Sequence, residues 1–419
     1  MTHTDKKKAI LIIADGLGGR PTDVDGRTCL EAARTPQLDA LTERGEIGLV
    51  DPIGPGIRPG SDTAHLSLLG YDPHRVYTGR GVFECLGAGL AVAERDVCFR
   101  ANLATVEDEE GALRLVDRRA GRIETGQGAL AEAINGIRLT GDVAFEFRAT
   151  TQHRGALRLR ATGLSSRIGE TDPHEIGALV PACAVLDEQD EGARRTAAAI
   201  DELTRLSHEA LRDLPINRQR IEAGELPANV LLVRGASIRP RIETIESIYG
   251  VRGAVISGGA LYRGVGLAVG MQPIDVPGAT GGLDTDLAAK AGAALKALET
   301  LDYVFLHVKG TDNAGHDGDA SAKAAFIERI DRELIGPLVE RLDWRRTHLA
   351  FTGDHTTPPG FGDHTAEPVP VLMVGPDVRC DASTAFGERE AAAGGLSRFS
   401  GMVLPTLFNY NNWNPKFGS

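Results

Sequence analysis

The sequence predicts an α/β fold with a mostly parallel central sheet, helices on both faces of that sheet, and an inserted α+β domain. Short apolar segments recur along the chain, and stretches with helical periodicity lie between them. This alternation is typical of a parallel sheet covered on both faces. Within residues 71–226 the pattern changes to alternating strands, Gly-rich loops and many Arg residues. We therefore expect one domain made of residues 1–70 and 227–419, and an inserted domain of residues 71–226.

The composition excludes several classes of partner. The chain has 419 residues, 42% of them hydrophobic and 25% charged, which is enough for two domains with a buried core. The net charge of -12 argues against a nucleic-acid partner, because phosphate contacts need clustered Lys and Arg. Residues 9–14 form an apolar segment that is too short for a signal peptide or a membrane span, and no other segment is long enough. Five cysteines without CxxC spacing indicate a reducing cytoplasm.

The first part of the chain reads as strand, loop and helix units. Residues 9–14 predict a buried strand that ends at Asp15. Thr35 and Pro36 are typical of an N-cap and a first helical position. A strand over residues 47–50 leads through a Pro/Gly-rich loop to a short helix that begins at Ser61.

The remaining elements follow from the same patterns. In the insert we expect strands over residues 97–106 and 143–148 and a helix over 191–214. After it, the alternation of strands and helices resumes. Strands are predicted at 229–233, 253–257, 303–308, 348–352 and 369–374, and helices at 242–249, 261–269, 284–298 and 319–342.

Polar side chains that can bind a ligand follow the predicted strands. In an open α/β sheet, ligands bind beyond the carboxyl ends of the strands. Asp15 stands directly after the first strand, where it is either a metal ligand or a helix cap. Ser61 follows Gly60 at a helix start, so it is either an N-cap or a hydroxyl placed where the helix favours phosphate. Near a metal ion, such a hydroxyl becomes a nucleophile.

Two further loops carry metal-ligand patterns. Asp312 and His316 are four residues apart, which on a helical turn points both side chains the same way. The loop of residues 353–364 contains two Asp-His pairs, Asp354 with His355 and Asp363 with His364. A single Asp-His pair in a loop is more often a solvated turn or a helix cap than a metal site. The residues alone do not separate His364 from Asp363 as a ligand.

Together the loops predict a site for two metal ions. Carboxylate and imidazole without thiolate suit Mn²⁺ or Zn²⁺ better than Mg²⁺. Seven ligands are too many for one tetrahedral ion and fit two ions roughly 4 Å apart, the arrangement used in phosphoryl transfer. The candidates are Asp15, Ser61, Asp312, His316, Asp354, His355 and His364.

These motifs resemble those of the archaeal type of cofactor-independent phosphoglycerate mutases, in the alkaline phosphatase superfamily. The resemblance rests on the motifs around Asp15, Ser61, Asp312 and Asp354, and it extends over nearly the whole chain. Further matching segments are residues 77–81, 100–105, 120–123, 153–154, 171–174, 227–229, 234–235 and 278–281.

The resemblance implies an alkaline phosphatase-like fold and an isomerase of glycolysis that interconverts 3-phosphoglycerate and 2-phosphoglycerate through a phosphoserine at Ser61. One ion would be held by Asp312, His316 and His364. The other would be held by Asp15, Ser61, Asp354 and His355. Two divalent ions are implied, Mn²⁺ first, with Zn²⁺, Co²⁺ and Mg²⁺ as alternatives.

The insert would close over a small phosphorylated substrate and keep water away from the phosphoserine. The candidate substrate ligands are Arg100, His153, Arg154, Arg218 and Arg234.

Two residues depart from the family pattern. Arg263 stands where the family carries a Lys, and we take Arg263 as a candidate catalytic residue. His65 replaces an Asn. The alternatives are therefore a phosphatase of the superfamily, or a mutase or hydrolase specialised for a phosphonate or another phosphorylated hydroxy acid. The sequence gives no expectation for the oligomeric state.

Overall fold

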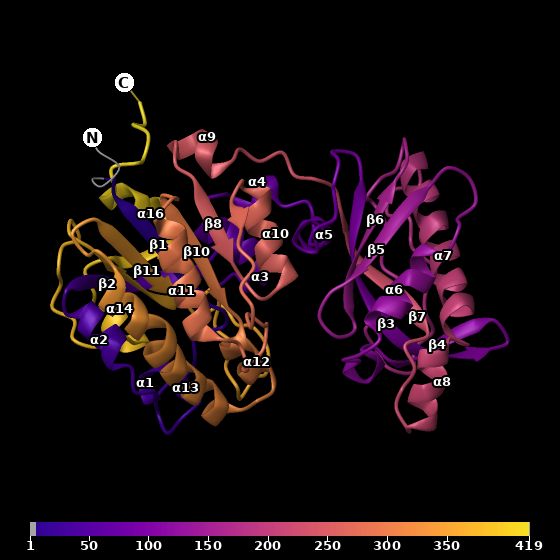
Figure 1. The fold of residues 1–419 in the computed structure, drawn as a ribbon, viewed down its shortest axis with the longest axis horizontal. Coiled ribbons are helices and arrows are strands. Elements are labelled where there is room, and N and C mark those ends of the chain that lie inside the picture. Colours follow the sequence, from indigo (N-terminus) through magenta and orange to yellow (C-terminus); the bar gives the residue numbers. More distant parts are fainter. Residues whose placement is uncertain (1–5, 419) are drawn as a thin grey trace. The chain divides into compact units, whose positions relative to one another are not determined.

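The computed structural model describes residues 6–418 and divides the chain into two compact units (Figure 1). Unit 1 consists of Met1–Tyr77 and Ile242–Ser419, and unit 2 is the continuous segment Thr78–Arg241. Each unit has its own sheet and its own hydrophobic core.

Unit 1 is built on an eight-stranded sheet that is parallel except for one strand. The exception is β12, which runs antiparallel to both of its neighbours, β11 and β2. This arrangement confirms the predicted mostly parallel sheet. The strands in spatial order are β13 (Ser397–Ser400), β2 (Gly45–Asp51), β12 (Val369–Val374), β11 (Thr347–Thr352), β1 (Lys8–Ala14), β10 (Tyr303–Val308), β8 (Gly253–Ile256) and β9 (Gln272–Pro273).

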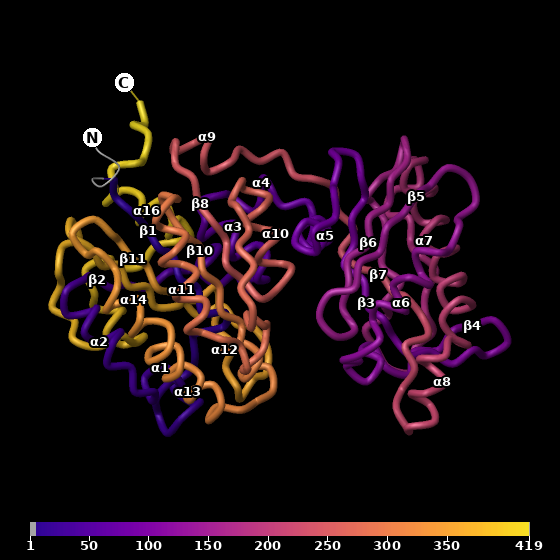
Figure 2. The backbone as a smooth tube through the Cα atoms, viewed as in Figure 1, coloured from indigo at the N-terminus to yellow at the C-terminus, as the bar shows by residue number. Residues whose placement is uncertain are grey.

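Strands from both ends of the chain meet at the middle of this sheet. Figure 2 shows β1, from the start of the chain, between β10 and β11, from its last third. Ala14 pairs with Val308, and Ile13 pairs with Thr352, so the three strands end at the same level. The loops that follow them therefore begin side by side.

Helices cover both faces of the sheet because both faces are apolar. Ile10 and Ile12 of β1 belong to a core shared with α2, α11 and α13, whereas Leu11 and Ile13 are buried on the opposite face. Figure 1 labels most of these helices. The helical elements of unit 1 are α1 (Cys29–Ala32), α2 (Pro36–Thr42), α3 (Ser61–Leu68), α4 (Pro73–Val76), α9 (Ile245–Tyr249), α10 (Ala260–Ala268), α11 (Leu287–Leu298), α12 (Gly310–His316), α13 (Ala320–Arg329), η3 (Ile330–Ile335), α14 (Gly336–Arg341), α15 (Glu388–Ala391) and α16 (Val403–Tyr410).

Unit 2 is an antiparallel α+β unit. The strand β3 pairs with β4, β6 and β7, and β5 pairs with β6. The strands are β3 (Val97–Glu109), β4 (Ala112–Asp117), β5 (Ala144–Ala149), β6 (Arg154–Arg160) and β7 (Val230–Ser237), and the helical elements are α5 (Gly81–Gly87), η2 (Ala120–Arg122), α6 (Gln127–Asn135), α7 (Glu191–Leu211) and α8 (Pro215–Glu222).

The strand β7 corrects one expectation from the sequence. Its apolar residues were expected to resume the parallel sheet, but β7 pairs antiparallel with β3 and so belongs to unit 2. The second unit accordingly spans residues 78–241, where the sequence suggested 71–226. An apolar strand has the same pattern in either sheet, and only its hydrogen-bonded partner decides between them.

The described residues contain no helix that is long and apolar enough to cross a membrane. All five cysteines lie in the described part of the chain and carry free thiols.

Candidate metal centre

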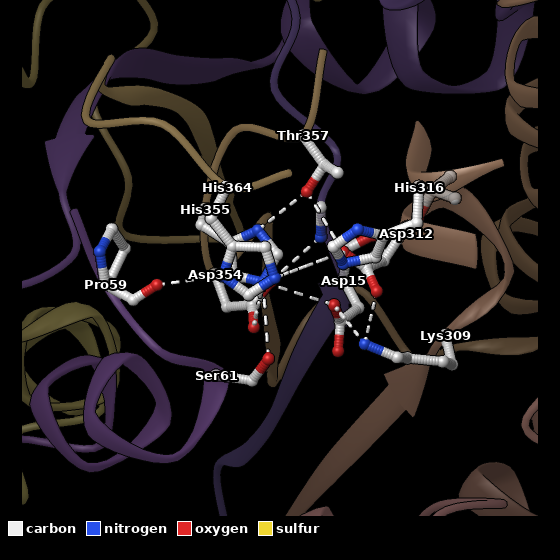
Figure 3. Close-up of polar contacts among 12 residues, drawn as sticks. Asp15, Pro59, Ser61, Lys309, Asp312, His316, Asp354, His355, Thr357 and His364 are labelled. Atoms are coloured by element: carbon white, nitrogen blue, oxygen red, sulfur yellow. Dashed lines mark hydrogen bonds and ion pairs between the residues drawn. The ribbon is translucent and has the colours of Figure 1, made fainter. Parts of the chain in front are cut away.

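The predicted ligands converge at the carboxyl edge of the unit 1 sheet. Asp15 follows β1, Asp354 follows β11 by one residue, and Asp312 lies in α12 directly after β10. The loop after β2 leads to Ser61, the first residue of α3. Side chains from four loops thus meet at one place, as Figure 3 shows.

The ligand atoms form two groups. Asp312, His316 and His364 make one group, and Asp15, Asp354 and His355 make the other. Within each group, one oxygen or nitrogen of each residue lies within 4.8 Å of the others. The Oγ of Ser61 lies 3.3 Å from Nε2 of His355 and so joins the second group. All seven residues chosen from the sequence are brought together.

The three imidazoles are oriented by their Nδ1 atoms. Nδ1 of His316 donates to the carbonyl of Gly362, and Nδ1 of His364 donates to the carbonyl of Pro59, each at 2.9 Å. Because a carbonyl oxygen can only accept, Nδ1 carries the proton and Nε2 of the neutral ring keeps its lone pair.

The Nδ1 atom of His355 also donates a hydrogen bond, in this case to the hydroxyl of Thr357. Oγ1 of Thr357 donates to Oδ1 of Asp312 at 3.0 Å and accepts from Nδ1 of His355 at 2.9 Å. The Nε2 atoms of His316 and His364 lie 3.4 Å and 3.6 Å from Oδ1 of Asp312. Lone pairs of nitrogen and oxygen that face one another in this way suit a cation.

Asp354 offers a free, buried oxygen. Its Oδ1 accepts from the backbone N–H of Gly16 at 2.9 Å, whereas its Oδ2 is buried and has no hydrogen-bond partner among the described residues. Burial and the charge of Asp15 raise the pKa of Asp354 to about 7. A buried carboxylate oxygen without a donor is costly unless a cation or proton meets it, so the residues fit a divalent metal ion.

Two residues that the sequence analysis did not select complete the charge balance. Nζ of Lys309 donates to Oδ1 of Asp15 at 3.0 Å and to Oδ2 of Asp312 at 2.5 Å. Nε2 of His307 lies 2.9 Å from the other oxygen of Asp15. Burial raises the pKa of Asp15, but Lys309, His307 and His355 outweigh burial and hold that pKa well below its usual value.

The pKa of Lys309 is shifted in the opposite direction from that of Asp15. Burial lowers its pKa, but the charges of Asp15 and Asp312 raise it well above the usual value. Lys309 follows β10 directly, so its position beside a strand end was the available sequence signal.

Arg263 contacts a residue that lies outside this centre. Its guanidinium forms an ion pair with Asp275. The preceding residue of α10, Tyr262, faces the centre instead and stacks on His307 with ring centroids 3.5 Å apart. Successive residues of a helix point about 100° apart, so only one of the two can face inward. The sequence expectation that Arg263 acts beside Ser61 receives no support from its contacts.

Unit 2 contains a separate cluster of positive charge. Arg100 and Arg234 are register partners in β3 and β7. Burial, followed by the charges of Arg80 and Arg234, holds the pKa of Arg100 well below its usual value. Burial and the charges of Arg154 and Arg100 lower the pKa of His153 to about 3. Four of the five predicted substrate ligands thus interact electrostatically.

The fifth predicted substrate ligand, Arg218, is exposed on α8 and is not among the charges that perturb this cluster. Nε of Arg100 and Nδ1 of His153 are buried without a hydrogen-bond partner in the described structure. Crowded guanidinium groups beside an imidazole with an unpaired nitrogen are suited to an anion.

A serine hydroxyl beside clustered carboxylates and imidazoles is used by enzymes that transfer phosphoryl groups with divalent metal ions, and this fold and centre place the chain in that class.

Comparisons with known proteins then define the family. The chain belongs to the 2,3-bisphosphoglycerate-independent phosphoglycerate mutases, whose family model matches residues 42–217. It is 45% identical to the Methanopyrus kandleri enzyme of that name, over 99% of both chains. It is 47% identical to enzyme 1 of that name from Archaeoglobus fulgidus, over 98% of this chain and 99% of the relative.

Solved structures agree with this membership. A Pyrococcus horikoshii protein superimposes with a TM-score of 0.85 at 37% identity, covering 99% of this chain and 100% of the other. The cofactor-independent phosphoglycerate mutase of Thermoplasma acidophilum gives a TM-score of 0.68 at 34% identity, covering 97% and 100%. The fold expected from the sequence resemblance is therefore confirmed.

Proposed function

We propose that this phosphoglycerate mutase interconverts 3-phosphoglycerate and 2-phosphoglycerate through a phosphoserine formed on Ser61. The observation that carries the proposal is the position of the Ser61 hydroxyl, 3.3 Å from His355 Nε2 at the edge of the second ligand group. Ser61 also starts α3, where free backbone N–H groups and the helix dipole favour a phosphate.

Two divalent metal ions are proposed for the two ligand groups. Asp312, His316 and His364 would hold one ion. Asp15, Ser61, Asp354 and His355 would hold the other. Oxygen and imidazole ligands without thiolate favour Mn²⁺, with Zn²⁺, Co²⁺ and Mg²⁺ as alternatives. When bound, the ions would lower the pKa of the serine hydroxyl and offset the negative charge of the phosphoryl oxygens.

The reaction needs two transfers of one phosphoryl group. First, Oγ of Ser61 bonds to the phosphorus of 3-phosphoglycerate while the bond from phosphorus to the C3 oxygen breaks. The serine proton passes to that oxygen, which leaves as the hydroxyl of glycerate. The C2 hydroxyl of glycerate then attacks the phosphoserine, and Oγ of Ser61 leaves and regains a proton. His355 Nε2 lies close enough to orient the Ser61 hydroxyl for these steps.

The positive cluster of unit 2 is proposed to bind the anionic groups of the substrate. Arg100, His153, Arg154 and Arg234 supply guanidinium and imidazole donors that suit a carboxylate or a phosphate. Their mutual electrostatic interaction supports this role. Arg218 remains a candidate from the family resemblance alone.

An assay coupled to enolase tests the proposal. Metal-depleted protein, resupplied with Mn²⁺ and given 3-phosphoglycerate, should form 2-phosphoglycerate, and a chelator should abolish the reaction. The same assay with Zn²⁺, Co²⁺ and Mg²⁺ ranks the ions. Steady release of inorganic phosphate without 2-phosphoglycerate would mean that the protein is a hydrolase. The proposed cytoplasmic location is checked separately, by fractionating cells that express the tagged full-length chain.

A further inference from the structure

His65 lies directly behind the nucleophile and is completely buried. It is four residues after Ser61 in α3, so both side chains lie on one face of that helix. Around its ring are Tyr262 and His307, with ring centroids 5.0 Å and 5.2 Å away. His65 therefore packs the helix that carries the nucleophile against Tyr262 and His307, which lie beside the metal centre.

One ring nitrogen of His65 touches both parts of the site. Nδ1 lies 2.6 Å from the carbonyl oxygen of Ser61 and 3.4 Å from Oδ2 of Asp354. The Ser61 carbonyl oxygen can only accept, so Nδ1 carries a proton and donates to it, while Oδ2 of Asp354 lies beside the same nitrogen. Oδ2 of Asp354 is the buried oxygen that has no hydrogen-bond partner by the usual criteria in the described structure. Nδ1 of His65 at 3.4 Å and Nε2 of His355 at 3.3 Å both face this oxygen.

The second ring nitrogen shows that His65 is not simply filling space. Nε2 is buried and has no hydrogen-bond partner among the described residues. Leaving such a nitrogen unpaired costs free energy, which an apolar side chain of similar size would avoid. The feature that histidine adds at this position is the Nδ1–H group that faces Ser61 and Asp354.

We propose that His65 is a positioning residue whose Nδ1–H holds the Ser61 carbonyl and the Asp354 carboxylate in one frame, and so fixes the Ser61 hydroxyl against Asp354 and His355. The inference rests on the proposed roles of Ser61 and Asp354. Residues that orient ligands from behind typically change metal affinity or activity about 10- to 100-fold when they are replaced.

Three substitutions of His65 distinguish the effect of the Nδ1–H donor from the effect of the ring itself. His65→Asn keeps an N–H donor at the position of Nδ1, whereas His65→Gln moves the donor to the position of Nε2. His65→Leu removes the donor and keeps an apolar side chain. The matched control is His348→Leu. His348 is also fully buried, but it lies near the start of β11, whereas Asp354 follows the end of that strand. Thermal melts establish that each variant is folded.

The first readout is the affinity of metal-depleted protein for Mn²⁺, which electron paramagnetic resonance measures. His65→Leu and His65→Gln should weaken one of the two Mn²⁺ sites about 10- to 100-fold, while His65→Asn stays within about threefold of wild type. The second readout is the assay coupled to enolase. The same two variants should lose about 10-fold or more in kcat, with KM for 3-phosphoglycerate within about threefold. His348→Leu should match wild type in both.

The outcomes distinguish this inference from the proposed function. Wild-type protein that binds fewer than two Mn²⁺ ions, or forms no 2-phosphoglycerate, would overturn the proposed function and this inference with it. A normal wild type together with unchanged Mn²⁺ affinity and kcat in folded His65→Gln or His65→Leu would overturn the inference alone. So would a folded His65→Asn as impaired as His65→Gln, because the Nδ1 donor would then not be the feature that matters.

Discussion

Ser61 is the residue on which the chemistry depends, and its surroundings explain why a serine can react here. Its hydroxyl lies beside His355, and its backbone starts a helix whose N-terminus favours negative charge. Neither contact makes a serine a strong nucleophile by itself. The activation of Ser61 is therefore attributed to the divalent ion proposed for the second ligand group, at whose edge the hydroxyl lies.

Replacing Ser61 should separate catalysis from metal binding. Ser61→Ala removes the proposed nucleophile and leaves six other ligands, so we expect kcat to fall by about 10⁴-fold or more while Mn²⁺ still binds. Enolase-coupled kinetics and Mn²⁺ titration measure the two properties. Ser67→Ala is the matched control on the same helix and should keep wild-type turnover. A Ser61→Ala protein with full turnover would exclude the covalent mechanism.

Glu388 makes a second residue-scale prediction, for stability rather than catalysis. Burial raises its pKa from 4.5 to about 7. The folded protein therefore binds more protons than the unfolded chain between these two values, and stability falls as the pH rises through this window. In Glu388→Gln the amide oxygen still accepts from Gly19 N, and the amide nitrogen can donate to Oγ1 of Thr28.

Chemical denaturation at about pH 5 and about pH 8 measures this effect. The free energy of unfolding of Glu388→Gln, relative to wild type, should increase on the order of 2 kcal/mol between the two conditions. Glu390→Gln, exposed on the same helix, should show no such increase. A difference for Glu388→Gln that does not change with pH would contradict the shifted pKa.

The candidate ligands of this site could be selected from the sequence, but the groups that hold them in place could not. Asp312 and His316 could be selected because they share a loop and a helical spacing. His307 lies inside β10, where an apolar context hides its contact with Asp15. Thr357 is an ordinary loop residue until it is seen to bridge His355 and Asp312. Such contacts depend on distances across the fold, which local pattern does not contain.

At the scale of elements, the turn after β1 must pass very close to α12. Gly16 has a φ of +63°, and a Cβ there would lie 2.8 Å from Cα of Asp312 and 2.7 Å from Oγ1 of Thr357. A side chain at this position would push apart two of the loops that carry ligands. Only glycine fits both the backbone angle and the space.

Gly16→Ala should therefore destabilise the fold and weaken metal binding together. We expect the free energy of unfolding to fall by roughly 2 kcal/mol or more, from left-handed strain plus the steric clash. The control is Gly26→Ala, which has a φ of +84° but open space around it and should lose only about 1 kcal/mol. Equal losses in the two variants would show that the close approach to α12 is unimportant.

The predictions from sequence were correct for most element types, and the sheet to which β7 belongs was predicted wrongly. Most strands and helices lie where periodicity placed them. Arg263 was chosen by its position in a motif, yet the rotation of α10 turns Tyr262 toward the centre instead. The strand β7 was recognised as a strand but joined to the wrong sheet. The pairing of β7 and the direction of the Arg263 side chain both depend on the fold, which hydrophobic pattern does not specify.

At the scale of the whole molecule, unit 2 is one continuous segment with a core of its own. Its core includes residues from β3, β6, α7 and β7, such as Phe99, Leu157, Ile200 and Val233. We expect a fragment of residues 78–241 to fold alone, because its core comes from within the segment. Calorimetry should show one cooperative unfolding transition.

A fragment of residues 71–226 provides the comparison. It lacks β7, so it leaves an edge of β3 without its partner and removes Leu231 and Val233 from the core. We expect this fragment to unfold without a cooperative transition or to aggregate. If both fragments behaved alike, β7 would not be an essential part of unit 2.

The most direct test of the account is the detection of phosphate on Ser61 during turnover. Wild-type protein with Mn²⁺ is mixed with 3-phosphoglycerate, quenched in acid within one turnover, and analysed by peptide mass spectrometry. The account predicts phosphate on the peptide that contains Ser61, and none when Mn²⁺ is withheld. Rapid formation of 2-phosphoglycerate with no phosphate on Ser61 at any quench time would contradict it.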